Sequence, residues 1–256
     1  MRGKRRKERM ILKNATLHIG NGEVFQGDMR IADGKIVEVG KNINGDESRS
    51  LNGKHVFPGF IDSGNFLGAQ DMAFFAKDYN ENSNPVTPYL DIWHSIDPDE
   101  LSLQELYKAG ITSMLVTPGN EGILGGTCTV VKTKGKNINK ITVKRDAAMK
   151  ASMTSEVIRV FSGKGSPQTP MALMAMLKTA LQTTEYANDY RSQRTKEVMD
   201  AVREGRIPIL VACETAPEME RFLEATKEYT KMKIIFTLSY EADRCADAIK
   251  KRGAAV

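Results

Sequence analysis

The sequence predicts an α/β protein with a parallel β-sheet. The first observation is that short apolar segments alternate with helical patterns of about 10–15 residues from residue 97 onward. Strands separated by such helices are joined by right-handed crossovers, which place successive strands parallel. The second observation is that residues 10–57 carry short alternating strands and turns instead, which predicts a small β-unit before the main sheet. Pattern alone leaves two architectures open for the main part, a doubly wound open sheet and a (β/α)8 barrel.

The N-terminal β-unit is expected from three segments in which apolar and polar residues alternate. The segments ILKNATLHIG, EVFQGDMRI and KIVEVG lie within residues 11–40, and Asp33-Gly34 supplies a tight hairpin turn. The continuous apolar run HVFPGFID, residues 55–62, comes next. Such a run is typical of a strand that is buried on both faces of a parallel sheet.

Helices and strands are expected to alternate in the main part. Asp97 can cap a first helix, with Pro98 at its first position and Gly110 closing it. Thr169-Pro170 begins a methionine-rich helix. The other expected helices span residues 192–204, 216–230 and 241–251, and the expected strands or extended segments span residues 111–116, 127–135, 140–145, 208–214 and 233–239.

Composition and charge are those of a soluble globular protein, with 41% hydrophobic and 27% charged residues in a chain of 256. The net charge of +5 arises in a basic tail, residues 1–9, which we expect to be solvated and disordered. The rest of the chain has 31 basic and 31 acidic residues, so nucleic acid is not an expected partner. No apolar run is long enough to cross a bilayer and no secretory signal is present. We therefore expect a cytoplasmic protein without a membrane partner.

Several motifs occur in the order found in one enzyme superfamily. Residues 56–68 read V-F-P-G-F-I-D-S-G-N-F-L-G and follow the hairpin unit. Downstream lie N-E-N-S-N-P-V-T-P at 80–88, G-I-T-S-M-L-V-T-P-G-N at 110–120, G-G-T-C-T-V-V-K-T-K-G at 125–135 and I-P-I-L-V-A-C-E-T-A-P-E at 207–218. On these residues the sequence resembles the amidohydrolase superfamily, and within it the imidazolonepropionase-related amidohydrolases, from Met10 to the C-terminus.

The resemblance implies an incomplete (β/α)8 TIM-type barrel, residues 58–256, preceded by a small N-terminal β-sandwich segment, residues 10–57. Superfamily members hold a divalent metal such as zinc at the C-terminal ends of the barrel strands. Two ligand histidines come from strand one, others from strands five and six, and an aspartate from strand eight. Such a metal lowers the pKa of bound water to about 7 and yields a hydroxide that hydrolyses non-peptide C–N bonds in cyclic amides or imidazolones. The chain ends at Val256 with two βα units of this barrel still to come, so the aspartate has no counterpart.

The positions that the resemblance assigns to metal ligands carry other residues in this sequence. When the superfamily motif P-G-x-I-D-x-H-x-H-x-G is aligned with residues 58–68, other residues stand at both histidine positions. Other residues also stand at the positions of the H-A-H of strand five and of the histidine in the next strand. Only one of the substituted residues, a glutamate, keeps a metal donor. The aligned positions are Gly64, Phe66, Ala212, Glu214 and Leu238.

The chain contains only three histidines, His18, His55 and His94, and no two of them have the spacing of a metal-binding pair. We expect all three to be structural. The cysteines, Cys128, Cys213 and Cys245, form no C-x-x-C pair, which fits a reducing compartment.

Four side chains remain as catalytic candidates, and three of them have a structural alternative. Asp62 is a candidate general base, or it fixes the end of its strand through backbone hydrogen bonds. Lys132 is a candidate group for binding an anion or a carbonyl, or it is simply solvated in its lysine-rich run. Glu214 is a further acidic candidate. Cys213 is a candidate nucleophile, but a thiolate needs a base and no histidine is near in sequence, so a small buried residue is the alternative.

These observations predict an amidohydrolase-family protein that is catalytically impaired, a truncated protein or pseudoenzyme, with no cofactor expected in this chain. One alternative is a hydrolase with a nonstandard site, for which a small-molecule substrate is expected. Another is a binding or assembly protein, because an incomplete barrel leaves open strand edges through which homo- or hetero-oligomers can form.

Overall fold

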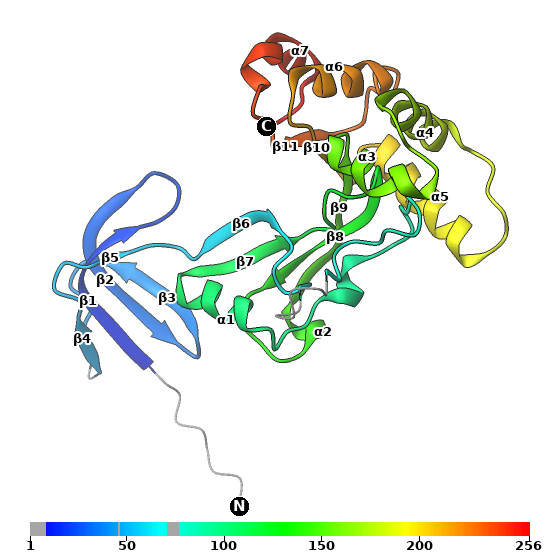
Figure 1. Cartoon of the computed structure of the whole chain (residues 1–256). Helices are drawn as coiled ribbons and strands as arrows, with labels where there is room; N and C mark the ends of the chain where they lie inside the picture. The colour runs from blue at the N-terminus through cyan, green and yellow to red at the C-terminus, as the bar shows by residue number, and fades with distance from the viewer. Residues whose placement is uncertain (1–8, 46, 71–76) are drawn as a thin grey trace, which may run out of the picture. The chain divides into compact units, whose positions relative to one another are not determined.

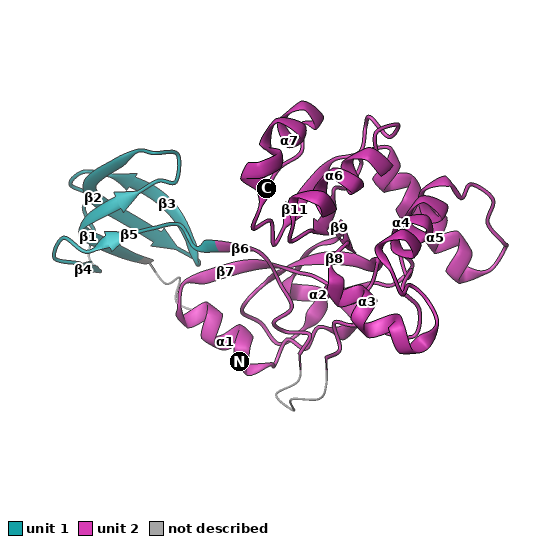
Figure 2. Cartoon of the chain, turned by 45° about the horizontal axis from the view of Figure 1, so that its top comes forward, with its two compact units in different colours: residues 1–60 teal, residues 61–256 magenta. Residues whose placement is uncertain are grey.

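The computed structural model describes residues 9–45, 47–70 and 77–256. The chain divides into two compact units, residues 1–60 and 61–256, which Figure 2 shows in teal and magenta. The predicted disordered tail lies outside the described residues, except for Arg9, which begins the first strand. No helix in the described ranges is long and apolar enough to cross a membrane.

The first unit is a sheet whose strands are arranged around β1. β1 pairs antiparallel with β2 and parallel with the short strands β4 and β5. β2 and β3 form the predicted hairpin, and the φ angles of Asp33 and Gly34 are both positive, 51° and 74°, as a type I′ turn requires. The strands are β1 Arg9–His18, β2 Val24–Ala32, β3 Lys35–Gly40, β4 Ser48–Ser50 and β5 His55–Val56.

Alternation along the strands gives this sheet one buried face. Ala15, Leu17 and Met29 are buried together, with Phe25 and Val56 packed against them. The strands within residues 9–45 and 47–60 form one sheet, which does not establish the two-layer sandwich expected from the resemblance.

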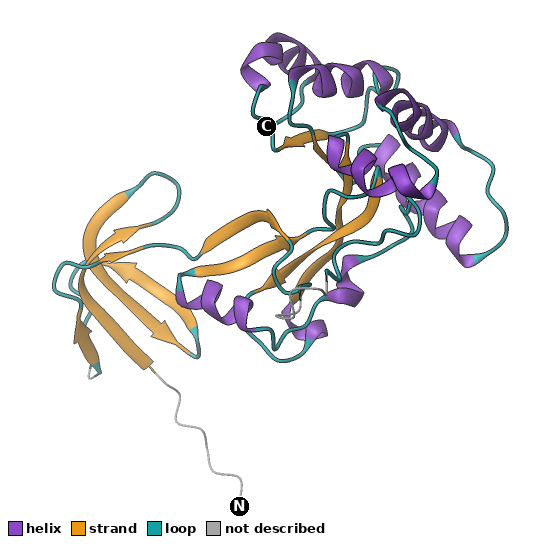
Figure 3. Ribbon diagram, viewed as in Figure 1, coloured by secondary structure: helices purple, strands orange, loops and turns teal. Residues whose placement is uncertain are grey.

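The second unit is built on a six-stranded sheet in the order β11-β10-β9-β8-β7-β6, which curls into a half-barrel (Figure 3). β9, β10 and β11 are parallel, as the alternation of strands and helices predicts. The strands are β6 Phe60–Asn65, β7 Ile111–Val116, β8 Leu124–Lys132, β9 Thr142–Ser152, β10 Ile209–Ala212 and β11 Ile234–Thr237.

β8 departs from the expected parallel arrangement, because it runs antiparallel to both of its neighbours, β7 and β9. The connection from β7 to β8 contains no helix, and the connection from β8 to β9 contains only α2, Ile138–Ile141. A parallel crossover needs a dozen or more residues, usually with a helix, so these short connections produce antiparallel neighbours.

The helices that follow β9 along the chain gather around the β9–β11 end of the sheet (Figure 1), and their apolar faces bury one face of it. Phe161, Phe222 and Phe236 are among the largest fully buried side chains of this layer. The helices are α3 Ser155–Phe161, α4 Pro170–Gln182, α5 Tyr190–Arg203, α6 Ala216–Ala225 and α7 Ala246–Arg252.

Local capping explains where most of these helices begin. The Thr169 side chain accepts the Ala172 N–H at 3.2 Å, with Pro170 at the first helical position, as predicted. The predicted start of the first helix at Asp97 is wrong. α1 spans Leu101–Lys108, and Asp97 instead accepts the N–H of Asp99 at 2.9 Å in the preceding turn.

Gly205 is expected to be irreplaceable where the chain leaves α5. Its φ is +70°, and a Cβ added there would lie 2.1 Å from the carbonyl oxygen of Lys231. We expect Gly205→Ala to lower the free energy of unfolding by at least about 2 kcal/mol, since a left-handed alanine is strained and the backbone must also move. Gly163→Ala is the matched control, because nothing lies within 4 Å of its added Cβ. Urea unfolding measures both variants, and equal losses of stability would contradict the expectation.

Candidate functional site

The carboxyl ends of β6, β10 and β11 carry the positions that the sequence resemblance assigns to metal ligands. Gly64 has no side chain, and a Cβ built there would be 3.5 Å from Thr117 Cγ2. The ring of Phe66 stacks on Tyr79, with ring centroids 4.2 Å apart. Ala212 is fully buried and Leu238 is partly exposed. Their hydrocarbon side chains offer no lone pair to a cation.

Glu214 is the one ligand position that keeps a metal donor. Its backbone N–H donates to Glu218 Oε2 at 2.7 Å, and Glu218 also accepts the N–H of Thr215 at the start of α6. Thr237 Oγ1 and Ser239 Oγ, on either side of Leu238, are buried without a hydrogen-bond partner among the described residues. Neutral hydroxyls are not among the usual ligands of zinc, so these groups do not replace the missing histidines.

The described residues contain no cluster of three or more histidine, cysteine, aspartate or glutamate side chains placed to hold a metal. His18 and His55 do meet in space, with Nε2 and Nδ1 2.9 Å apart on the paired strands β1 and β5. Spacing in the sequence could not show this meeting. Phe57 stacks on His18 at 4.0 Å between ring centroids, and His94 lies in the short 3-10 helix Ile92–Ser95 of the second unit.

Asp62 and Lys132 are both engaged in local hydrogen bonds. Asp62 accepts the Gly64 N–H at 2.9 Å through one oxygen and the Asn65 amide at 2.5 Å through the other. Lys132 Nζ donates to Ser113 Oγ at 2.8 Å, linking β8 to β7. These contacts tie both side chains to the scaffold.

Cys213 is fully buried behind the end of β10. Burial raises the pKa of its thiol, and the nearby Glu218 raises it further. The neutral thiol therefore prevails at physiological pH, and a neutral thiol is not the nucleophilic form of cysteine.

Lys150 is a buried cationic residue that the sequence reasoning missed. It lies in β9, opposite Gly126 of β8 and Leu210 of β10. Ala148, two residues earlier, packs with Cys128 and Leu210 on the same face of the sheet, whereas Met149 and Ala151 belong to the helix-covered core. Lys150 therefore points to the face opposite the helices, and only 5% of its surface is exposed.

Within the described residues the Lys150 amine has no hydrogen-bond or ion-pair partner, although it is not one of the fully buried unpaired atoms. Burial lowers the pKa of its amine to about 8, while the neighbouring thiols of Cys128 and Cys213 oppose the shift. Burial also raises the pKa of Cys128 to about 12, so this thiol stays neutral beside the amine. A single lysine inside the run A-A-M-K-A-S was the sequence signal that could have identified it.

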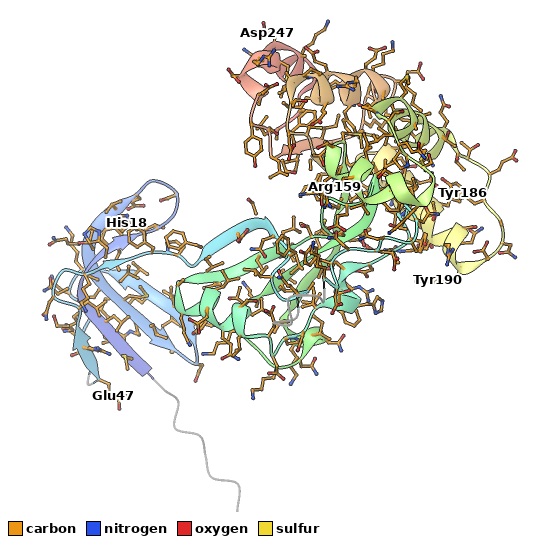
Figure 4. All side chains as sticks on the ribbon, in the orientation of Figure 1. His18, Glu47, Arg159, Tyr186, Tyr190 and Asp247 are labelled. Carbon is orange, nitrogen blue, oxygen red and sulfur yellow. The ribbon has the colours of Figure 1, made fainter. Side chains whose placement is uncertain are left out.

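A large open cavity of about 1060 Å³ lies elsewhere in the second unit. Its wall includes Tyr89, Asp91, Arg145 and Arg194, and Tyr190 at the start of α5, which Figure 4 labels. The positions assigned to metal ligands do not line it, but Pro118 and Gly125, next to β7 and in β8, do.

Arg145 and Asp146 reach this cavity because β9 bulges. Between Ala148 and Lys144 the register with β8 shifts, and Asp146 adopts a positive φ of 48°. Arg145 donates from Nε to Asp91 at 3.0 Å and stacks over Trp93, while Arg194 pairs with Asp146. Both guanidinium groups are thus balanced by carboxylates.

No protein-family model matches the chain, and no curated protein matches it. Solved structures do match. An amidohydrolase from Thermotoga maritima MSB8 superposes with a TM-score of 0.85 at 23% identity, over 95% of this chain and 68% of that chain. A prolidase complexed with N-methylphosphonate-L-proline gives a TM-score of 0.41 at 13% identity, over 96% and 65% of the two chains. The L-hydantoinase of Arthrobacter aurescens gives 0.31 at 14% identity, over 89% and 58%.

The Thermotoga superposition establishes the fold, a mixed α/β half-barrel shared with part of an amidohydrolase. The chain spans about two thirds of the length of that amidohydrolase and less of the prolidase and the hydantoinase. An identity of 23% supports a shared fold but not a shared activity, because proteins with unrelated functions share such barrels.

Lys150→Met is expected to stabilise the protein by about 2 kcal/mol at pH 7, because burial disfavours the ammonium that the substitution removes. The folded pKa of about 8 lies below the ordinary lysine value of about 10.4. The destabilisation by Lys150 is therefore complete below pH 8 and disappears as the pH rises toward 10.4. Denaturant unfolding of both proteins at pH 7 and pH 9.5 measures this. A difference that stays constant or grows with pH would contradict the buried-amine interpretation.

Proposed function

We propose that this chain is an amidohydrolase-superfamily protein of the imidazolonepropionase-related type that does not perform metal-dependent C–N hydrolysis. The observation that carries the proposal is the identity of the side chains at the carboxyl ends of the strands. Gly64, Phe66, Ala212 and Leu238 occupy positions where a catalytic relative needs imidazole nitrogen.

The residues present do not fit a divalent metal. A catalytic zinc needs three protein donors around an open coordination position, and Glu214 supplies one carboxylate. The Phe66 ring, stacked on Tyr79, fills space beside β6 with hydrocarbon. We therefore derive no hydrolytic step through a metal-bound hydroxide for this chain.

A metal-independent hydrolase is disfavoured by the same contacts. Asp62 is held by Gly64 and Asn65, Lys132 by Ser113, and burial keeps Cys213 neutral. Of these candidates, only Glu214 has a polar side chain that makes no hydrogen bond to another described residue and is not held neutral by burial. If a screen of cyclic amides and imidazolones finds hydrolysis, Glu214→Ala must abolish it for a nonstandard site to be accepted.

Metal content tests the proposal directly. The chain is purified from zinc- and manganese-supplemented medium, dialysed, and analysed by plasma mass spectrometry. We expect well below about 0.1 equivalent of either metal per chain, because side chains without lone pairs cannot retain it. One tightly bound equivalent that survives dialysis would overturn the proposal. Glu214→Gln is the control variant, since loss of bound metal in it would locate the site.

Assembly is the second candidate function, and it is favoured by apolar side chains on sheet edges. β3 and β6 are terminal strands in their sheets. Ile36 and Val37 of β3 are 61% and 57% exposed, and Phe60 and Ile61 of β6 are 59% and 74% exposed. Unpaired strand edges with apolar side chains bind other strands.

Sedimentation velocity across a concentration series tests the assembly candidate. We expect the wild type to associate as its concentration rises. Ile61→Lys should weaken that association at least about tenfold, because a charged side chain on an exposed edge strand disfavours pairing with another strand. Ile61→Thr keeps strand propensity without the charge and is the control. A monodisperse wild-type monomer at every concentration would eliminate assembly between copies.

A further inference from the structure

We propose that His18 and His55 form a surface site for a divalent transition-metal ion that prefers square-planar nitrogen ligands, with copper(II) as the ion bound most tightly. The site lies in the first unit, on strands β1 and β5, and shares no residue with the strand ends of the half-barrel. This inference therefore does not rest on the proposed function. It rests on the way in which strand pairing brings two imidazole rings together.

The pairing of β1 with β5 places both histidines on the solvent face of the first sheet. The two strands are parallel, and Leu17 pairs with Val56. Leu17 is buried and Val56 packs against the same cluster. Successive side chains of a strand point to opposite faces, so the neighbouring residues His18 and His55 lie on the other face. His55 is exposed and His18 is half-buried, which leaves the pair open to an ion from solvent.

Aromatic stacking restricts the orientation of the imidazole rings. The Phe57 ring stacks on His18 with centroids 4.0 Å apart and an interplanar angle of 18°. The His55 ring stacks on His18 as well, with centroids 5.2 Å apart and an interplanar angle of 29°. Because the rings are already ordered, binding of an ion costs little side-chain entropy.

The two facing ring nitrogens have the separation of neighbouring ligands on one square-planar ion. His18 Nε2 and His55 Nδ1 are 2.9 Å apart and share one hydrogen bond. Two nitrogens that bind an ion at about 2.05 Å and at right angles lie about 2.9 Å apart, whereas tetrahedral ligands lie about 3.3 Å apart. The separation therefore favours copper(II) over zinc.

Binding replaces the hydrogen bond between the rings with two coordinate bonds. Each neutral imidazole has one N–H and one nitrogen lone pair. The ion takes the lone pairs of His18 Nε2 and His55 Nδ1, while the two protons occupy His18 Nδ1 and His55 Nε2. Small rotations about the Cβ–Cγ bonds aim both lone pairs at the ion. Water fills the other coordination positions, because the described residues place no third histidine, cysteine, aspartate or glutamate beside the pair.

A site with two protein ligands binds its ion reversibly, in contrast to the four ligands of a structural zinc site. Such an ion is lost on dialysis, so the metal-content test of the strand ends is unaffected by this site. The two tests also depend on different variants. Substitution of His18 or His55 reports on the histidine pair, and Glu214→Gln reports on the strand ends.

Titration of the untagged full chain with copper(II) tests the proposal, because the whole sequence contains only three histidines. Electron paramagnetic resonance in a non-coordinating buffer reports the stoichiometry and the number of nitrogen ligands. We expect one equivalent bound through two nitrogens. His18→Asn and His55→Asn should each weaken binding at least about tenfold, since loss of one ligand removes chelation. His94→Asn is the matched control, because His94 is exposed in the second unit and its loss should leave the affinity unchanged.

Protection from diethyl pyrocarbonate provides a second measurement, made on the wild-type chain. Copper(II) should slow the modification of His18 and His55 in proportion to its occupancy and leave the modification of His94 unchanged.

Three results would overturn the proposal. The first is the absence of saturable copper binding. The second is equal affinity in the wild type and in His18→Asn, which would place the ion elsewhere, for example at the N-terminal amine. The third is equal protection of all three histidines, which would show that the pair has no preference over a single exposed imidazole.

Discussion

The parallel register of β9, β10 and β11 is the constraint on which the rest of the structure depends. Pairing of Leu210 with Lys150 and of Ala212 with Ser152 fixes which residues face the helices and which face the inside of the half-barrel. The helix-facing side buries large apolar residues such as Phe236 and Met149, so a slip of one residue would expose them. The same register places Lys150 on the inner face, where no helix covers it. The same strand register therefore determines both the packing of the helix-covered core and the position of Lys150.

The scaffold and the positions that the sequence resemblance assigns to metal ligands depend on different residues. The helix layer needs apolar residues at regular intervals, and these are present in β10, β11, α4 and α6. Metal binding needs imidazole at a few strand ends, and there the chain has glycine, phenylalanine, alanine and leucine. The two requirements involve different residues, so a sequence can meet the first without meeting the second.

The sequence predicted much of the fold but little of the candidate site. The hairpin at Asp33-Gly34, the cap at Thr169 and the parallel strands at 209–212 and 234–237 follow from local turn chemistry and from the alternation of strands and helices. The antiparallel direction of β8 was not predicted, because hydrophobic periodicity carries no information about strand direction. Helix α1 begins three residues later than a cap at Asp97 suggested, since an aspartate caps a turn as readily as a helix. Burial of Lys150 and the meeting of His18 with His55 depend on strand register, which no spacing along the chain reveals.

The central proposal is that the strand ends of this fold do not bind a divalent cation, and a competition titration with a chromophoric zinc chelator tests it most directly. The purified chain is added to the zinc-loaded chelator at neutral pH, and the absorbance reports any metal transferred. The account predicts that the chelator keeps its zinc at every protein concentration, because one carboxylate at Glu214 cannot compete with a multidentate ligand. Stoichiometric removal of zinc by the folded chain, lost on Glu214→Gln, would contradict it.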